Sequence, residues 1–253
     1  MNLKEKAMHK KYDIIYSLGR DCACAMYMKQ NKLRITSGPF DWLTNASFET
    51  RFNMILNDFA GFLSPDDIQF LPKNPNVIND EKCDYYENVR NGFYYYHDFP
   101  INVPMSESLP EVINKYNRRI ARFYKNIRTK KRVLLIWFSH CSNTPDKMII
   151  DLCNKVCGKF GKTIDFLIIE HKQNQKTPIC TELAHNITKY NLHTTATDDM
   201  GRPTTQGNTT ACNPLFAQFG LHIPWRHKIT MFFINIVPLH NLRHKLRNNY
   251  LGQ

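Results

Sequence analysis

Short apolar runs alternate with amphipathic segments over much of the chain. Residues 12–18 (YDIIYSL), 132–138 (RVLLIWF) and 164–169 (IDFLII) are rich in β-branched and aromatic side chains, and each has the length of a buried strand. Residues 192–197 are a fourth strand candidate. Continuous apolar runs of this kind are typical of strands covered on both faces, as in a parallel sheet.

Two of the intervening segments have the composition or period of helices. In residues 109–128, apolar side chains recur at spacings of three and four, and Pro110 stands where a first-turn proline belongs. Residues 22–31 favour a helix directly after the first strand, because Ala, Met and Lys are frequent there. The first strand is therefore expected to lead through a short turn into a helix.

Two Thr-Pro pairs give further start signals for helices. Thr144-Pro145 and Thr177-Pro178 each join a capping residue to a proline suited to the first helical position. They predict one helix that ends near Gly158 or Gly161 and another that ends near Tyr190. Strands and helices that alternate through short loops indicate βαβ units. The predicted class is α/β, a mostly parallel sheet with flanking helices.

Two segments depart from this alternation. Residues 36–108 are rich in Pro, Asn, Asp and aromatic side chains, which predicts an irregular insertion of helical turns and loops packed over the sheet. Residues 226–253 begin with a strongly apolar stretch and continue with Leu and basic residues, which predicts a C-terminal amphipathic helix. We therefore divide the chain into a single α/β domain, residues 1–225, and a basic amphipathic tail.

Composition and charge narrow the class of partner. The chain has 253 residues, 42% of them hydrophobic and 12% aromatic, which is enough for a sizeable core. Its formal net charge of +12 favours an anionic or glycan/acyl substrate or an anionic membrane surface. Residues 229–238 (ITMFFINIVP) precede Arg243, Lys245 and Arg247, so the tail can lie at such a surface. No nucleic-acid-binding motif accompanies the charge, and we expect no nucleic acid partner.

The expected compartment follows from hydropathy and constrains the role of the cysteines. No run reaches the roughly 18 apolar residues of a spanning helix, and residues 1–6 are polar, so we expect a cytoplasmic protein, peripheral on the inner face of the cytoplasmic membrane where its tail binds lipid. Eight cysteines in a reducing compartment are free thiols, metal ligands or nucleophiles. Cys153 and Cys157 share a helical face without a second pair nearby, so we expect neither a metal ion nor a cofactor.

Cys22 stands at the turn best placed for chemistry. It follows the first strand and would begin a helix at the carboxyl edge of the sheet, where ligands bind. A helix N-terminus and Arg20 lower the pKa of a thiol, whereas Asp21 opposes them. Gly19, Arg20 and the amides of the first helical turn are candidate oxyanion donors. The competing interpretation of Cys22 is a buried structural thiol. Cys24, two residues further on, is expected to be a core thiol of that kind.

A cysteine nucleophile needs a base, normally histidine. His140 and His171 each follow a buried strand and so belong to the same edge, while His97 lies in an aromatic segment beside Asp98. Asp198 and Asp199 follow the fourth strand and could orient one of these rings. Sequence spacing does not rank the three histidines, because the partners need only be close in space. A hydrogen-bonded structural role is the alternative for each.

The residues around the Cys22 turn resemble a known family. The matching blocks are Ser17-Leu18-Gly19-Arg20-Asp21-Cys22, Leu33-Arg34 and Ser37-Gly38-Pro39-Phe40-Asp41-Trp42. Together they resemble the opening motif of a bacterial family of papain-like cysteine peptidases, known as domain of unknown function 1796. Residues 96–99 resemble its downstream histidine block. The resemblance spans about residues 12–225 and is most specific over residues 16–43.

The resemblance implies a set of roles. Cys22 would be the nucleophile and His97 the base, with Asp41 or Asp98 as the orienting group. It also implies a papain-like α+β fold, which differs from the α/β fold that alternating strands and helices predict. We expect the α/β fold, and we take the site residues from the family motif. The first hypothesis is a cysteine-dependent hydrolase or acyl-transfer enzyme. The others are a transferase or modifying enzyme of bacterial surface polysaccharide or lipopolysaccharide biosynthesis, in which Cys22 is structural, and a non-catalytic binding protein.

Overall fold

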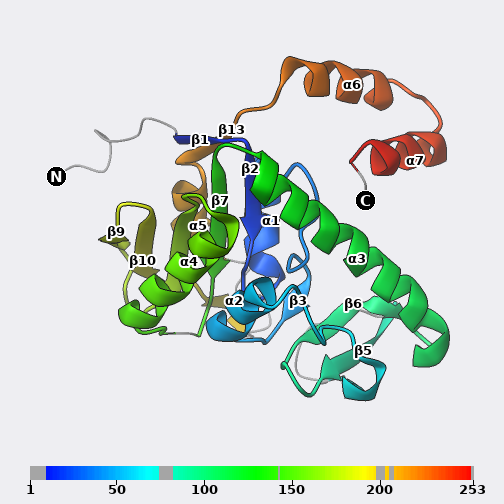
Figure 1. The fold of residues 1–253 in the computed structure, drawn as a ribbon, viewed down its shortest axis with the longest axis horizontal. Coiled ribbons are helices and arrows are strands. Elements are labelled where there is room, and N and C mark those ends of the chain that lie inside the picture. Colours follow the sequence, from blue (N-terminus) through cyan, green and yellow to red (C-terminus); the bar gives the residue numbers. More distant parts are fainter. Residues whose placement is uncertain (1–9, 74–81, 142, 198–202, 205–207, 252–253) are drawn as a thin grey trace.

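A five-stranded sheet forms the centre of the fold (Figure 1). The computed structural model describes residues 10–73, 82–141, 143–197, 203–204 and 208–251. The strands lie in the order β2-β7-β8-β10-β9, the first four mutually parallel and β9 antiparallel to β10. An α/β architecture thus fits the alternation in the sequence. The strands are β2 (Ile14–Ser17), β7 (Val133–Phe138), β8 (Asp165–His171), β10 (Ile187–Leu192) and β9 (Ile179–Ala184).

Every residue of β7 is buried, because helices cover both faces of the sheet. Val133, Leu135 and Trp137 pack into one hydrophobic cluster, whereas the alternate residues of the strand pack into the other. The first cluster includes residues of α2 (Phe48–Leu56), α3 (Met105–Thr129) and α4 (Asp146–Phe160). The second includes residues of α1 (Cys22–Gln30) and α5 (Thr209–Phe216).

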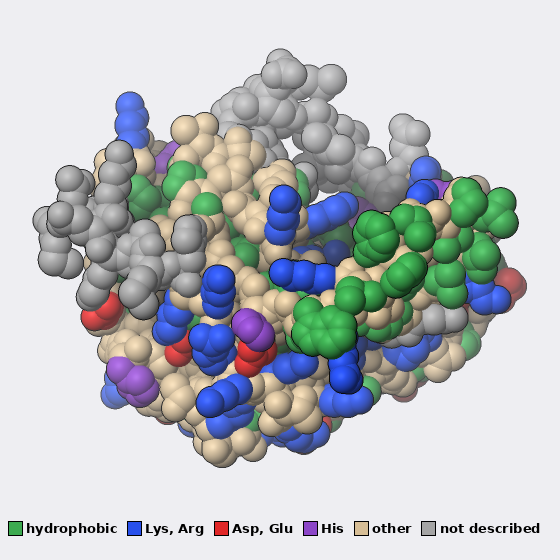
Figure 2. Space-filling view, turned by 90° about the horizontal axis from the view of Figure 1, so that it is seen from above, with side chains coloured by type: hydrophobic (Ala, Val, Ile, Leu, Met, Phe, Trp, Pro, Cys, Tyr) green, Lys and Arg blue, Asp and Glu red, His purple; other side chains and the backbone are tan. Residues whose placement is uncertain are grey.

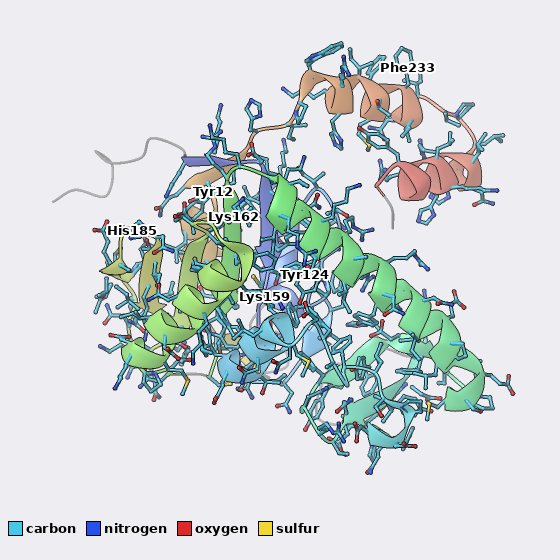
Figure 3. All side chains as sticks on the ribbon, in the orientation of Figure 1. Tyr12, Tyr124, Lys159, Lys162, His185 and Phe233 are labelled. Atoms are coloured by element: carbon cyan, nitrogen blue, oxygen red, sulfur yellow. The ribbon has the colours of Figure 1, made fainter. Side chains whose placement is uncertain are left out.

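Polar contacts join the three helices of the first face where they converge (Figure 3). The hydroxyl of Tyr124, on α3, donates a hydrogen bond of 2.7 Å to the carbonyl of Ile55 on α2. The ammonium group of Lys159, on α4, donates one of 2.9 Å to the carbonyl of Leu56. These bonds satisfy carbonyl groups at the C-terminal end of α2, which have no partner within the helix.

The observed ends of α3 and α4 can be compared with the ends that the sequence predicted. α4 begins directly after Thr144-Pro145 and ends at Gly161, whose φ of 61° is the left-handed cap conformation that glycine adopts readily. α3 begins earlier than predicted, after Pro104, so Pro110 lies in its second turn and not its first. α3 otherwise covers the segment whose apolar periodicity indicated it, and α4 covers the segment between its predicted start and stop signals.

The helix predicted after Thr177-Pro178 is wrong. Residues 179–192 form the antiparallel hairpin β9–β10, and the fourth parallel strand ends at Leu192, where the sequence had indicated its start. The segment contains four β-branched residues, two in each strand, and Ile187 and Leu192 of β10 are buried. A threonine before proline also favours extended backbone, so the cap signal was ambiguous here.

The expectation of an irregular insertion over residues 36–108 is also wrong. The segment forms α2, the 3₁₀ helix η1 (Pro65–Asp67) and a four-stranded antiparallel sheet in the order β3-β6-β5-β4, which lies beneath the N-terminal part of α3 in Figure 1. Its aromatic side chains join the first hydrophobic cluster of the central sheet, with Phe62, Phe93 and Phe99 buried there beside residues of α3 and β7. The strands are β3 (Leu43–Thr44), β6 (Tyr94–Pro100), β5 (Cys83–Asn88) and β4 (Ile68–Phe70).

The remaining elements lie outside the two larger sheets. The C-terminal tail forms two helices where one was predicted, because Pro238 lies between them. Within the described ranges, no helix is both long and apolar enough to cross a membrane. The elements are β1 (Lys10–Tyr12), paired in parallel with β13 (Phe219–Leu221); β11 (Ala196–Thr197), paired with β12 (Pro203–Thr204); α6 (Trp225–Asn235); and α7 (His240–Leu251).

Candidate active site

The turn between β2 and α1 is held against the carboxyl end of β7. The amide of Leu18 donates to the carbonyl of Ile136 at 2.7 Å, and the amide of Arg20 donates to the carbonyl of Phe138 at 2.8 Å. The turn therefore continues the β2–β7 ladder past the last paired residues of the sheet. This arrangement places Cys22, the first residue of α1, at the carboxyl edge, as the sequence predicted.

Gly19 and Arg20 serve the turn and not an oxyanion site. The amide of Gly19 donates to the hydroxyl of Ser17 at 3.1 Å, and that of Arg20 is already bonded to β7. A Cβ atom at position 19 would lie 2.4 Å from the Cβ of Cys24, so only glycine fits this approach. Cys24 is fully buried and belongs to the core, as predicted. Both backbone amides have partners within the fold, which argues against the predicted oxyanion role for these two donors.

His97 is the histidine that the structure brings to the sulfur of Cys22. The Sγ atom lies 4.0 Å from Nε2 of His97, at the outer limit of a sulfur hydrogen bond. His97 lies on β6 of the antiparallel sheet, so the pair bridges the edge of the central sheet and the second sheet. Cys22 is partly exposed and His97 is exposed, which leaves the pair open to a ligand.

The Pro-Phe-Asp-Trp block shapes the surroundings of His97. The ring of Trp42 meets the His97 ring edge-on, with centroids 6.1 Å apart, and the guanidinium of Arg34 lies 5.5 Å from the Trp42 ring. Asp41 accepts hydrogen bonds from Nε of Arg34 at 2.7 Å and from the amide of Gly38 at 3.0 Å. Asp41 thus anchors the loop that carries Trp42, and this geometry does not support its expected role as an orienting acid.

Asp98 is directed away from the pair. Successive residues of a strand point to opposite faces, and Asp98 is buried whereas His97 is exposed. Its carboxylate accepts a hydrogen bond of 2.9 Å from the Tyr116 hydroxyl and lies 2.6 Å from the ammonium group of Lys115. Asp98 therefore fastens β6 to α3, and adjacency in sequence was a poor guide to an orienting role.

His140 lies beside the turn but contacts the residue before the cysteine. Its Nδ1 is 2.8 Å from one carboxylate oxygen of Asp21, while the other oxygen caps α1 by accepting from the amide of Ala23 at 2.8 Å. Asp21 thus links His140 to the first turn of the helix that carries Cys22. The other proposed acids, Asp198 and Asp199, lie outside the described residues.

His171 has partners farther along the same edge. Its Nδ1 lies 3.2 Å from both the amide and the hydroxyl of Thr194, and its ring centroid is 4.9 Å from that of His193. Burial, followed by the charges of His193 and His140, lowers the pKa of His171. Sequence reasoning missed His193 because the fourth strand was predicted over residues 192–197. That prediction put His193 inside the strand, whereas it directly follows the end of β10. In the described part of the chain, no three His, Cys, Asp or Glu side chains are placed to hold a metal ion.

Burial, and to a smaller extent the carboxylate of Asp21, raises the pKa of the Cys22 thiol to about 11. The amide of Cys22 and the charge of Arg51 lower this pKa, but by less. The expectation of a lowered pKa is therefore wrong, although the opposing effect of Asp21 was predicted. At neutral pH the sulfur carries its proton and needs a base to become a nucleophile.

The raised pKa predicts slow alkylation of Cys22 at neutral pH. Only the thiolate reacts, so the rate with iodoacetamide should keep rising toward pH 11, past the ordinary cysteine pKa of 9.0. At pH 7 the thiolate fraction should be about a hundredfold below that of an ordinary cysteine. Peptide mass spectrometry on one digest compares Cys22 with the exposed Cys141 at each pH. A midpoint at or below pH 9 would contradict this assignment.

The fold and the site define an α/β protein with a Cys–His pair at the carboxyl edge of its parallel strands. The chain belongs to the family described as "Putative papain-like cysteine peptidase (DUF1796)", whose model matches residues 13–174. The match includes Cys22, His97 and the strands through β8, and it ends well before residue 225, where the resemblance was expected to end.

A curated relative has no assigned activity. The chain is 25% identical over 179 residues to the uncharacterized protein R408 of Acanthamoeba polyphaga mimivirus, which covers 65% of this chain and 80% of the relative. Because this relative is viral, the bacterial origin implied by the sequence resemblance is not shown. No solved structure matches the chain.

Proposed function

We propose that the protein is a cysteine-dependent hydrolase in which Cys22 is the nucleophile and His97 the base. The observation that carries the proposal is the 4.0 Å contact between the sulfur and Nε2, made across 75 residues of sequence and two different sheets. Catalytic hydrogen bonds are often long without substrate and tighten when substrate binds. The family description supports a hydrolase of this general kind, and a peptide bond is the specific substrate that it suggests.

The raised thiol pKa sets the order of the steps. With a neutral thiol at rest, Nε2 of His97 takes the proton as the sulfur attacks an acyl carbon. The carbonyl electron pair moves onto oxygen to give a tetrahedral oxyanion. When it collapses, the bond to the leaving group breaks and His97 returns the proton to that group. Water, deprotonated by the same ring, then attacks the thioester and releases the acid and the free thiol.

The amide of Cys22 itself is the oxyanion donor that this geometry favours. It belongs to the same residue as the sulfur, and it lowers the pKa of the thiol. As part of the first turn of α1 it has no carbonyl partner within the helix. The developing oxyanion is bonded to the carbon that the sulfur attacks, and so it falls within reach of the same N–H. Among the donors expected from the sequence, this choice takes an amide of the first helical turn and not those of Gly19 and Arg20.

Acylation by p-nitrophenyl acetate tests the proposal without knowledge of the natural substrate. We expect Cys22 to be acylated in a step that slows about 10²- to 10⁴-fold in His97→Gln, because the ring no longer accepts the proton. The exposed Cys141 gives a reference within the same molecule, since its acylation should not respond to this substitution. Intact and peptide mass spectrometry follow both sites.

Equal slowing at both cysteines, or none at Cys22, would contradict the Cys–His assignment. The first result would indicate a general loss of structure, and the second a structural thiol. A structural Cys22 is what the alternative hypotheses require, namely a glycan-modifying transferase or a binding protein. Adding peptide amines as acceptors separates the two forms of the proposal, because acyl transfer gives new amides whereas hydrolysis gives acetate.

A further inference from the structure

The C-terminal helices carry an unusual share of the exposed apolar surface. Nine large apolar side chains between Trp225 and Tyr250 are exposed, whereas four are exposed in the rest of the described chain. Trp225, Phe232 and Leu239 are 67%, 62% and 66% exposed. A concentration of this kind marks an interaction surface, since scattered single residues would be ordinary.

The exposed residues of α6 lie along one face of the helix. Trp225, Ile229, Phe232, Phe233 and the C-cap residue Ile236 recur at spacings of three and four. Phe233 lies on the outer side of α6, away from α3 (Figure 3). The apolar face of α6 is therefore presented to the surroundings.

The second helix continues the apolar surface. Leu242, Leu246 and Tyr250 also recur at spacings of four, and all three are exposed. With 11 and 12 residues, α6 and α7 are far shorter than the roughly 20 residues that span a bilayer. Helices of this length with an apolar face lie in the plane of a membrane interface.

The charge around this surface has a single sign. Five cations lie beyond residue 224, and no Asp or Glu follows Asp199 in the sequence. Figure 2 shows the hydrophobic patch beside Lys and Arg side chains. The cations of the two helices are Arg226, Lys228, Arg243, Lys245 and Arg247.

A polar cavity of about 400 Å³ opens beside these helices. Its lining residues are Asn235 at the end of α6 and His240, Arg243, His244 and Arg247 of α7. The guanidinium of Arg247 donates a hydrogen bond of 2.7 Å to the side-chain oxygen of Asn235, which fixes one wall. Two guanidinium groups and two imidazoles without a carboxylate form a site suited to a phosphate group.

We propose that α6 and α7 bind the surface of a bilayer that contains anionic phospholipids, with the apolar face in the interface and a lipid phosphate in the Arg243–Arg247 cavity. Charge complementarity selects this occupant. A second copy of the chain would bring the same five cations against each other, whereas an anionic bilayer supplies both counter-charge and an apolar layer. The inference does not depend on the chemistry of Cys22.

Vesicle flotation of the full-length protein tests the proposal. We expect binding to phosphatidylcholine vesicles that contain phosphatidylglycerol and not to phosphatidylcholine alone. Arg243→Gln with Arg247→Gln should weaken binding about 25-fold, roughly fivefold for each cation. Lys147→Gln with Lys176→Gln makes the same charge change at exposed positions outside the two helices and should have little effect.

The apolar half of the surface has its own variant. Phe232→Ser with Phe233→Ser should weaken binding to the same vesicles by roughly tenfold for each ring. Phe70→Ser with Ile179→Ser, at exposed positions elsewhere, should leave it unchanged. Circular dichroism checks that each variant is folded. If the phenylalanine variant does not fold, the arginine variant alone tests the proposal.

Three results would overturn the proposal. One is equal affinity for neutral and anionic vesicles, which would remove the role of charge. Another is binding of inorganic phosphate at the cavity without any vesicle binding, which would make the site one for a free anion. The third is a protein that does not bind vesicles but self-associates, as seen by light scattering, and loses that self-association in the phenylalanine variant.

Discussion

Replacing Cys22 by alanine is expected to lower the kcat for acyl transfer by a factor of about 10³ or more, because no other group at the site supplies a nucleophile in the proposed reaction. His97→Ala should lower kcat by about 10² to 10⁴. The loss at His97 is expected to be large here, because burial raises the pKa of the thiol to about 11 and the resting sulfur cannot react without giving up its proton.

The double variant distinguishes a catalytic pair from two independent residues. Groups that act in one step are non-additive, so Cys22→Ala with His97→Ala should be no slower than Cys22→Ala alone. Steady-state hydrolysis of an activated ester, corrected for the uncatalysed rate, measures all three. His140→Ala is the matched control, because His140 contacts Asp21, the neighbour of Cys22, and should cost only a few-fold. If His140→Ala were the slower variant and His97→Ala retained activity, the base would be misassigned.

The sequence predicted those elements whose environment is uniform along their length. β7 and β8 are covered on both faces, so their apolar runs show directly in the sequence. α4 has a start signal and a glycine stop that act locally. The β9–β10 hairpin was missed because a Thr-Pro pair suits both a helix start and an extended segment. The second sheet was missed because its aromatic residues gather around long-range contacts and show no simple period.

For the candidate site, too, the sequence predicted the features that depend on local sequence and missed those that depend on long-range contacts. The Cys22 turn could be predicted because a strand, a glycine and a helix follow one another within a few residues. His97 was one of three candidate bases, and only the family resemblance favoured it over His140 and His171, since a partner 75 residues away leaves no signal in spacing. Asp41 and Asp98 were orienting groups implied by the same resemblance, and the structure gives them other partners. The thiol pKa depends on burial, which local sequence does not reveal.

Arg51→Met is expected to lower the free energy of unfolding by about 3–5 kcal/mol, the largest stability effect that we predict for a single substitution. Arg51 is completely buried, and its guanidinium donates hydrogen bonds to the carbonyls of Leu43 at 2.9 Å, Arg20 at 3.1 Å and Ala46 at 3.3 Å. Burial lowers the pKa of Arg51 to about 9, so the group stays charged at neutral pH. Methionine fills similar space but leaves three interior carbonyls without these donors.

Urea unfolding followed by circular dichroism measures the loss. Arg90→Met is the matched control, because the Arg90 side chain is 69% exposed and its contact with Asp67 lies at the surface, so the cost should stay below about 1 kcal/mol. Arg51→Lys should fall between the two, since it keeps a charge but loses the planar fork that reaches several carbonyls. A loss at Arg51→Met no greater than at Arg90→Met would show that the buried bonds contribute little.

The Arg51 variants also connect stability to the site. One of the three carbonyls belongs to Arg20, two residues before Cys22, so the guanidinium ties the nucleophile turn to β3 of the second sheet, the sheet that carries His97. Arg51→Lys should therefore slow the His97-dependent acylation of Cys22 under conditions where the variant is fully folded. The acylation of Cys141 should not change, because a loosened turn lengthens the distance from sulfur to imidazole without affecting an exposed thiol elsewhere. Unchanged acylation of Cys22 in the folded Arg51→Lys protein would mean that the backbone ladder from Leu18 and Arg20 to β7 is enough to hold the turn.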